Sequence, residues 1–154
     1  MKLLVIDNYY LVPSLIASDI DLWWQDAGGG ASSPPEVIIA SRWDKAVALF
    51  EQHGGEIVGV ITDSLLEIEG LSRGADANRS GPGFYWLVRG LSADIPIVIY
   101  SMGGLNDTLK EALGLTALPP EAEGNWKFLP KGIDFEDLSW LHAIVEFARR
   151  RSPV

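Results

Sequence analysis

The sequence predicts a doubly wound α/β domain, in which a five-stranded parallel sheet is covered by helices on both faces. Five short, mostly apolar runs alternate with segments whose apolar residues recur at helical spacing, which is the pattern of βαβ units. The middle run, residues 57–61, is apolar throughout, as a strand buried on both faces requires. A chain of 154 residues is long enough to form one core, so we expect a single domain over residues 1–154.

The first four expected strands are short and contain valine and isoleucine, and the fifth contains Trp126 and Phe128; β-branched and aromatic residues favour extended backbone. The third strand is followed directly by Thr62 and Asp63. The fourth contains Pro96, which must lie at its beginning because proline cannot donate a hydrogen bond to the sheet. In chain order, the strands are expected at residues 3–6, 37–40, 57–61, 95–100 and 126–129.

The five expected helices each carry one apolar face. Pro13 fits the first turn of the first helix, where its missing N–H costs nothing. Trp23 and Trp24 are adjacent near the end of that helix, so we expect one of them to be partly exposed. The last helix ends in three arginines, where the helix dipole favours cations. The helices are expected at residues 11–24, 44–53, 84–91, 106–113 and 135–150, and segments 67–83 and 116–125 are expected to be loops.

The composition excludes several classes of function. The formal net charge of −9 repels phosphate backbones, so we expect no direct binding to nucleic acid. The chain has no cysteine and only two histidines, which excludes disulfides and thiolate metal sites and argues against a histidine-rich metal centre. The apolar N-terminal run is interrupted at Asp7, far too early for a membrane span, so we expect a cytoplasmic protein with no membrane association.

Polar residues follow four of the expected strands at the point where each strand ends. Asp7 and Asn8 follow the first, Asp63 follows the third, Ser101 follows the fourth, and Lys131 lies just after the fifth. In doubly wound sheets, ligands bind beyond the carboxyl ends of the strands. The sequence therefore predicts that two acids, an amide, a hydroxyl and an ammonium group meet at one edge of the sheet.

The same residues carry a resemblance to a known family. The segments Leu3–Asn8, Val60–Asp63, Ile97–Ser101 and Phe128–Lys131 are similar in order and strand placement to those of receiver domains of two-component response regulators. The resemblance covers essentially the whole chain. It implies a flavodoxin-like fold with strand order 2-1-3-4-5.

The resemblance also implies roles for the polar residues. Asp63 would accept a phosphoryl group from a histidine kinase or phosphotransfer protein, and Mg²⁺ would be held by Asp7, Asn8 and Asp63. Ser101 and Lys131 would bind the phosphoryl oxygens. These residue types suit the chemistry, because Mg²⁺ prefers oxygen ligands and most of the acceleration of phosphoryl transfer comes from positioning and charge neutralisation.

The family further implies a switch and partners. Ser101 and the aromatic residue Phe128 would couple phosphorylation to a surface that binds a downstream effector. Separately from the resemblance, an exposed tryptophan among Trp23, Trp24 and Trp86 would form the surface of a homodimer or an effector contact. We therefore expect a phosphoacceptor domain and not an enzyme, beyond self-catalysed phosphoryl transfer and autodephosphorylation.

One departure from the family pattern affects the metal. Receiver domains usually carry two adjacent acids after the first strand, whereas Asp7 is followed here by Asn8. The amide of Asn8 offers an oxygen but no charge, so we expect weak Mg²⁺ binding.

Two alternatives remain open. The chain could be a pseudo-receiver that binds partners without phosphorylation, a reading that Asn8 and Met102 favour. It could also be a small phosphatase-like enzyme with Asp7 as nucleophile, although the position of the usual second acid is taken by Tyr9, which cannot act as an acid near neutral pH.

Overall fold

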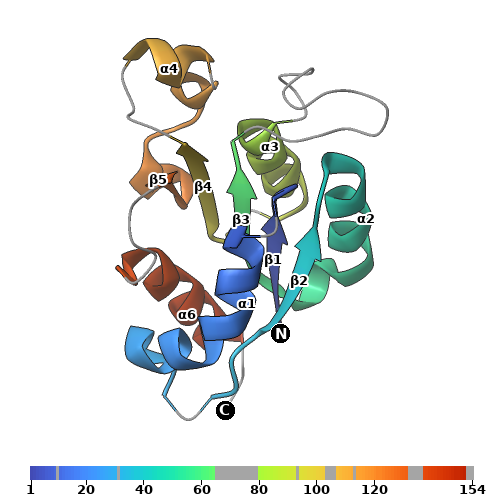
Figure 1. Ribbon diagram of the computed structural model, residues 1–154, viewed down its shortest axis with the longest axis vertical. Coiled ribbons are helices and arrows are strands. Elements are labelled where there is room, and N and C mark those ends of the chain that lie inside the picture. Colours follow the sequence, from blue (N-terminus) through green and yellow to red (C-terminus); the bar gives the residue numbers. More distant parts are fainter. Residues whose placement is uncertain are drawn as a thin grey trace.

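A computed structural model places five parallel strands in one sheet of order β2-β1-β3-β4-β5, which confirms the predicted fold class and strand order. The structure describes residues 1–9, 11–30, 32–64, 80–92, 94–102, 107–112, 114–131 and 137–151. All strands point the same way, so their carboxyl ends share one edge, at the top of the sheet in Figure 1. The strands are β1 (Lys2–Ile6), β2 (Glu36–Ala40), β3 (Ile57–Asp63), β4 (Ile97–Met102) and β5 (Trp126–Lys131).

The described part of the chain contains six α-helices, so the prediction of five helices was wrong by one. The additional helix is a single short turn in the segment that was expected to be a loop between the fourth helix and the fifth strand. The helices are α1 (Leu11–Trp24), α2 (Trp43–His53), α3 (Gly81–Leu91), α4 (Asp107–Ala112), α5 (Glu121–Gly124) and α6 (Ser139–Arg151). None of the described helices is long and apolar enough to cross a lipid bilayer.

Several predicted boundaries were displaced, and β3 and β5 each end two residues later than expected, so Asp63 and Lys131 are the last residues of their strands. Helix α3 begins at Gly81 instead of at residue 84, because the Ser80 side chain accepts a hydrogen bond from the Gly83 N–H and Pro82 occupies the first turn. Strand β4 begins and ends about two residues later than expected, so Ser101 lies inside the strand. Helix α6 begins at Ser139, four residues later than expected.

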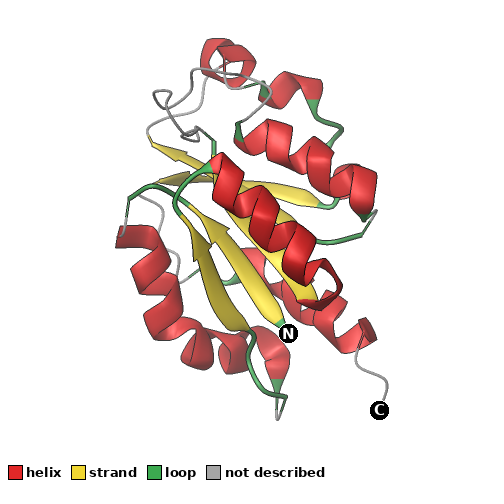
Figure 2. Cartoon of the chain, turned by 90° about the vertical axis from the view of Figure 1, so that its right-hand side faces the viewer, coloured by secondary structure: helices red, strands yellow, loops and turns green. Residues whose placement is uncertain are grey.

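Helices cover both faces of the sheet (Figure 2). Helices α1 and α6 contact one another, and α6 packs against β3, whereas α2 and α3 pack against β1, β3 and β4 from the other side. All seven residues of β3 are buried, as its unbroken apolar sequence predicts. The central strand is therefore held on both faces, which fixes the position of Asp63 at its end.

The two adjacent tryptophans of α1 are both buried, which contradicts the expectation that one would be partly exposed. Trp23 packs edge-on against Trp140 of α6, with ring centroids 6.1 Å apart. Trp24 is covered because the chain continues as a π-helix (Gln25–Gly29), and its indole N–H donates to the Ser32 hydroxyl at 3.2 Å. The segment after α1 thus shields the second tryptophan.

Ser64 is the first residue after β3, and Gly81 is the first residue of α3. These two residues are hydrogen-bonded to each other. The Gly81 N–H donates to the Ser64 carbonyl at 3.0 Å. A Cβ atom at position 81 would collide with the Asp63 carbonyl oxygen and lie 2.9 Å from the Ser64 Cα. Glycine is therefore required where α3 meets the end of β3, directly behind the predicted phosphoacceptor.

We predict that Gly81→Ala lowers the free energy of unfolding by about 1–3 kcal/mol, because backbone atoms would have to move to admit the methyl group. The matched control is Gly90→Ala in the same helix, where an added Cβ meets no atom within 4 Å. That change should be neutral or raise the free energy of unfolding by up to about 1 kcal/mol. Urea unfolding of both variants measures the difference, and equal effects at the two positions would contradict the close approach at Gly81.

Candidate functional site

Two acids lie side by side at the carboxyl edge of the sheet. Asp63 is the last residue of β3, and Asp7 directly follows β1. The register pairs Ile6 with Thr62, and the residue that follows each of them in the chain is an aspartate. Asp7 is 2% exposed and Asp63 is 1% exposed. The predicted meeting of these two residues is confirmed.

The carboxylate of Asp7 is held by hydrogen bonds to both of its oxygens. The Tyr9 backbone N–H donates to Oδ1 at 3.0 Å, and the Tyr100 hydroxyl donates to Oδ2 at 2.5 Å. The backbone N–H of Asp7 donates to the Ala40 carbonyl at 3.0 Å, which fixes the main chain as it leaves β1. A buried polar group needs such partners, because burying it without hydrogen bonds costs free energy.

Sequence reasoning missed Tyr100 as a site residue. It lies in β4, and the register pairs it with Asp63. A signal was present in the sequence, because Tyr100 ends an otherwise aliphatic run and a buried phenol usually needs a hydrogen-bond partner. The identity of that partner, on a strand two places away, required the fold.

Ser101 and Lys131 come to the same edge from the other two strands. Ser101 is buried in β4 and pairs with Pro130, and the backbone of Lys131, the last residue of β5, pairs with that of Met102. The Lys131 side chain lies outside the described residues. Phe128 lies in β5, three residues before Lys131, and is half-buried. It pairs with Ile99 of β4 and packs against the core.

Two buried oxygen atoms near the acids have no hydrogen-bond partner. They are the amide oxygen of Asn8 and the hydroxyl oxygen of Ser64, which follow the two aspartates in the chain. Oxygen atoms of this kind are suitable ligands for a hard cation such as Mg²⁺. The donor set of Asp7, Asn8 and Asp63 therefore fits Mg²⁺ in type, but only two members carry charge. No group of three His, Cys, Asp or Glu side chains that could hold a metal ion occurs among the described residues.

A cavity of about 320 Å³ opens beside Asp7 and Asn8. Its walls come from α1, from the end of β2 and from α2, and they include Ser41 and the exposed Lys45. The cavity reaches the edge of the sheet next to Asp7, and the Lys45 ammonium adds a positive charge to its lining.

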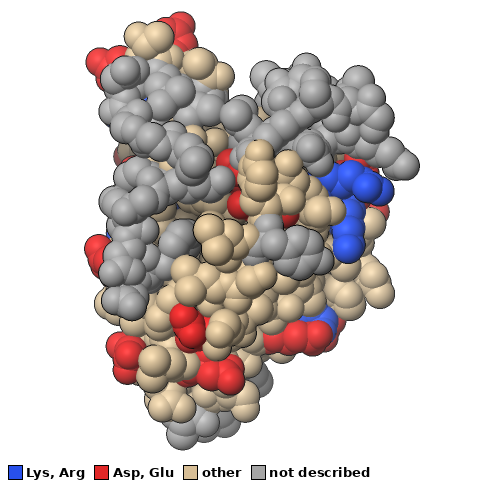
Figure 3. Space-filling model, in the orientation of Figure 1, with Lys and Arg blue, Asp and Glu red and all other residues tan. Residues whose placement is uncertain are grey.

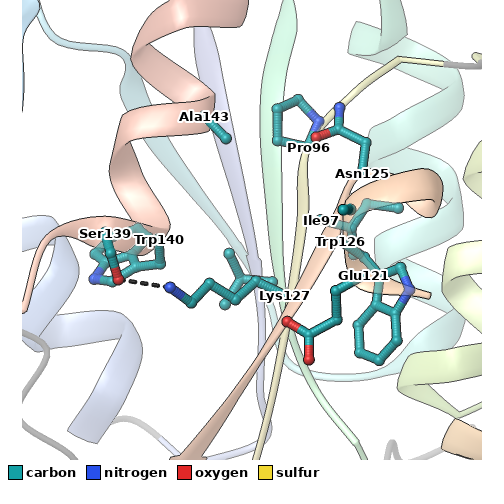
Figure 4. A pocket seen from close by; sticks show the side chains of 11 residues that line it. Pro96, Ile97, Glu121, Asn125, Trp126, Lys127, Ser139, Trp140 and Ala143 are labelled. Atoms are coloured by element: carbon teal, nitrogen blue, oxygen red, sulfur yellow. Dashed lines mark hydrogen bonds between the residues drawn. The ribbon is translucent and has the colours of Figure 1, made fainter.

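A second cavity, of about 290 Å³, lies between β4, β5, α5 and α6 (Figure 4). Trp126 and Trp140 contribute to its lining, and the Lys127 ammonium donates to the Ser139 hydroxyl at 2.6 Å. Its strand residues include Ile97 and Trp126, the first residues of β4 and β5, so it lies towards the amino ends of these strands. It is therefore separate from the site formed by Asp7 and Asp63.

No protein-family model matches the chain, and no curated protein matches its sequence. Solved structures do match it. A response regulator receiver domain protein from Clostridium thermocellum is 23% identical, with a TM-score of 0.58 over 97% of this chain and 95% of that one. A response regulator receiver protein from Sinorhizobium medicae is 18% identical, with a TM-score of 0.58 over 99% and 97%.

NtrX from Brucella abortus, solved with ATP, is 19% identical with a TM-score of 0.62, over 97% of this chain and 28% of that protein. These similarities extend over nearly the whole of this chain, and they agree with the observed strand order. The protein has the fold of a response regulator receiver domain.

Proposed function

We propose that this protein is a signalling domain that accepts a phosphoryl group on Asp63 from a phosphohistidine of a kinase or phosphotransfer protein. The observation that carries the proposal is the position of Asp63, a buried carboxylate at the end of the central strand with Asp7 beside it. The receiver fold supports the same role, because ligands of such sheets bind at this edge.

The carboxylate of Asp63 would attack phosphorus in line with the phosphorus–nitrogen bond of the donor. A new oxygen–phosphorus bond forms as the imidazole leaves with the electron pair of the broken bond. The Ser101 hydroxyl and the Lys131 ammonium are the proposed partners of the phosphoryl oxygens, as a hydrogen-bond donor and a compact positive charge. The negative charge added at Asp63 would then bias Ser101 and Phe128 towards a second arrangement that an effector recognises.

We propose that Asp7, Asn8 and Asp63 hold Mg²⁺, which when bound neutralises negative charge on the phosphoryl oxygens. The buried and unpartnered amide oxygen of Asn8 supports its place in this set. With an amide in place of an acid, the site attracts a divalent cation less strongly.

The N-terminal helix offers a docking surface next to the site. Leu11, Leu15 and Leu22, which we call the leucine ridge, lie on one face of α1 at helical spacing and are exposed, Leu11 to 81% and Leu22 to 64%. Helix α1 begins four residues after Asp7. We propose that the phosphodonor docks on this ridge.

Charge specifies what kind of partner fits the ridge. No Lys or Arg occurs between Lys2 and Arg42, and the exposed face of α1 and the turn after it carry Asp21 and Asp26. Figure 3 shows acidic and uncharged residues, without basic ones, over this helix. The proposed partner is therefore a helix with apolar residues at matching spacing and lysine or arginine beside them.

A phosphorylation-independent interaction module is the second candidate. The observation that favours it is the hydrogen bonding of Asp7, whose two oxygens already have donors without a metal ion. In that case the leucine ridge would still bind a partner, but Asp63 would carry no phosphoryl group.

Acetyl phosphate with Mg²⁺ tests phosphoacceptance directly. We expect intact-mass measurement to show one added phosphoryl group on the wild type and none on Asp63→Ala, because that variant lacks the attacking carboxylate. Asp94→Ala, which removes an exposed acid outside the site, serves as the matched control and should be labelled like the wild type. An unlabelled wild type, under conditions that label an ordinary receiver domain, would leave only the interaction module.

Restoring the second acid should strengthen metal binding. We predict that Asn8→Asp raises Mg²⁺ affinity roughly tenfold or more, because a carboxylate replaces a neutral ligand next to the cation. Gln25→Glu adds the same charge on the exposed turn after α1 and should leave the affinity unchanged. Calorimetric titration with MgCl₂ measures both variants, and an equal effect of the two would show that residue 8 is not a ligand.

Substitution of the leucine ridge should separate docking from chemistry. We predict that Leu22→Asp slows phosphoryl transfer from the phosphorylated histidine kinases of the same organism by about tenfold or more, because it places a charge in an apolar contact. Labelling by acetyl phosphate should be unaffected. Leu91→Asp, on the exposed side of α3, is the matched control. If both variants accept phosphoryl groups from the kinases at the wild-type rate, the donor docks elsewhere.

A further inference from the structure

Tyr100 reaches across the end of the central strand. Tyr100 is fully buried in β4, and its hydroxyl donates to Asp7 Oδ2 at 2.5 Å. Strands β1 and β4 are not neighbours, because β3 lies between them. The phenol therefore crosses the carboxyl end of β3 to reach Asp7. The strand register also pairs Tyr100 with Asp63.

This contact joins a phenol hydroxyl to a carboxylate oxygen. Hydrogen bonds to a charged acceptor are roughly twice as strong as those between neutral groups. With the Tyr9 N–H on Oδ1, it gives each oxygen of Asp7 a donor. These donors occupy two of the roughly four lone-pair sites of the carboxylate, and they offset part of the negative charge that would attract a cation.

We propose that Tyr100 occupies the place of a divalent cation at Asp7, so that the phenol hydroxyl and Mg²⁺ compete for Asp7 Oδ2. The proposal rests on the proposed function in one respect, that Asp7 belongs to a cation site. It makes Tyr100 a positioning residue that keeps the site closed to metal until the hydroxyl is displaced.

Displacement of the phenol has a consequence along β4. Tyr100 is followed directly by Ser101, the proposed switching hydroxyl, and the Tyr100 carbonyl accepts a hydrogen bond from the Ser64 N–H at 2.9 Å. Movement of the Tyr100 side chain would therefore act on the backbone that carries Ser101 and on the turn after Asp63. Cation binding and the arrangement of the switch would be coupled through one residue.

A purely structural hydrogen bond and a competing one give different results when the hydroxyl is removed. Loss of a structural bond lowers stability by the same amount at every Mg²⁺ concentration. Loss of a competitor lowers stability without Mg²⁺ and increases the stabilisation that Mg²⁺ provides, because the phenol hydroxyl no longer has to be displaced from Asp7 Oδ2 when the cation binds.

The experiment compares thermal unfolding midpoints of wild type, Tyr100→Phe and Tyr85→Phe across a series of MgCl₂ concentrations, with calorimetric titration of each. Tyr85 is the matched control, because its buried hydroxyl donates to the Gly124 carbonyl at 3.2 Å, away from the acids. We expect Tyr100→Phe to bind Mg²⁺ about five- to tenfold more tightly than the wild type, the factor that corresponds to one released hydrogen bond. Tyr85→Phe should bind it as the wild type does.

The proposal is overturned if Tyr100→Phe binds Mg²⁺ no more tightly than the wild type, or if neither protein responds to Mg²⁺. Should Tyr100→Phe fail to fold, Tyr100→Met removes the donor while keeping a large apolar side chain. A measurement on the wild type is also available. The Tyr100 hydroxyl proton should give a downfield NMR resonance that disappears as MgCl₂ is added, and a resonance that persists at saturation contradicts competition.

None of these measurements involves phosphoryl transfer. A protein that shows the competition but is never labelled at Asp63 would contradict the proposed function alone. A protein that is labelled at Asp63 but shows no competition would contradict only the role of Tyr100.

Discussion

Two carboxylates buried side by side are the constraint on which the rest of this structure depends. Asp7 and Asp63 follow neighbouring strands, and both are almost completely removed from solvent. Like charges at close range repel, and burial penalises the charged form of each, so the surrounding fold has to supply donors or cations. The Tyr100 hydroxyl and the Tyr9 N–H both donate to Asp7. The apolar packing of β3 on both faces holds the two acids together in spite of this cost.

The features that surround the acids converge on the same edge of the sheet. The chain leaves β3 at Ser64 and returns at Gly81 immediately behind Asp63, and α1 with its leucine ridge begins just after Asp7. The cavity beside Asp7 opens between α1 and α2. A phosphodonor docked on the leucine ridge would therefore lie next to the cavity. A change at Asp63 would act first on Ser64 and Gly81, which lie between the end of β3 and the start of α3.

The sequence was sufficient to predict the fold class, because unbroken apolar runs identify buried parallel strands. It also predicted that Asp7 and Asp63 lie at one edge of the sheet, because the carboxyl ends of parallel strands share an edge. It was insufficient where a side chain finds its partner through the fold. Trp24 is covered by the π-helical turn that follows it, and the hydroxyl of Tyr100 bonds to a strand two places away. The short helix α5 lies in a segment with weak periodicity, which was therefore expected to be a loop.

The most direct test of the central claim is a crystal structure of the protein with Mg²⁺ and beryllofluoride, which mimics a phosphoryl group on a carboxylate. The account predicts beryllofluoride density on Asp63, within contact of Ser101 and Lys131, and a magnesium ion on Asp7 with the Tyr100 hydroxyl displaced. Density on Asp7 instead of Asp63, or side chains of residues 63, 101 and 131 that do not converge on one anion, would contradict it.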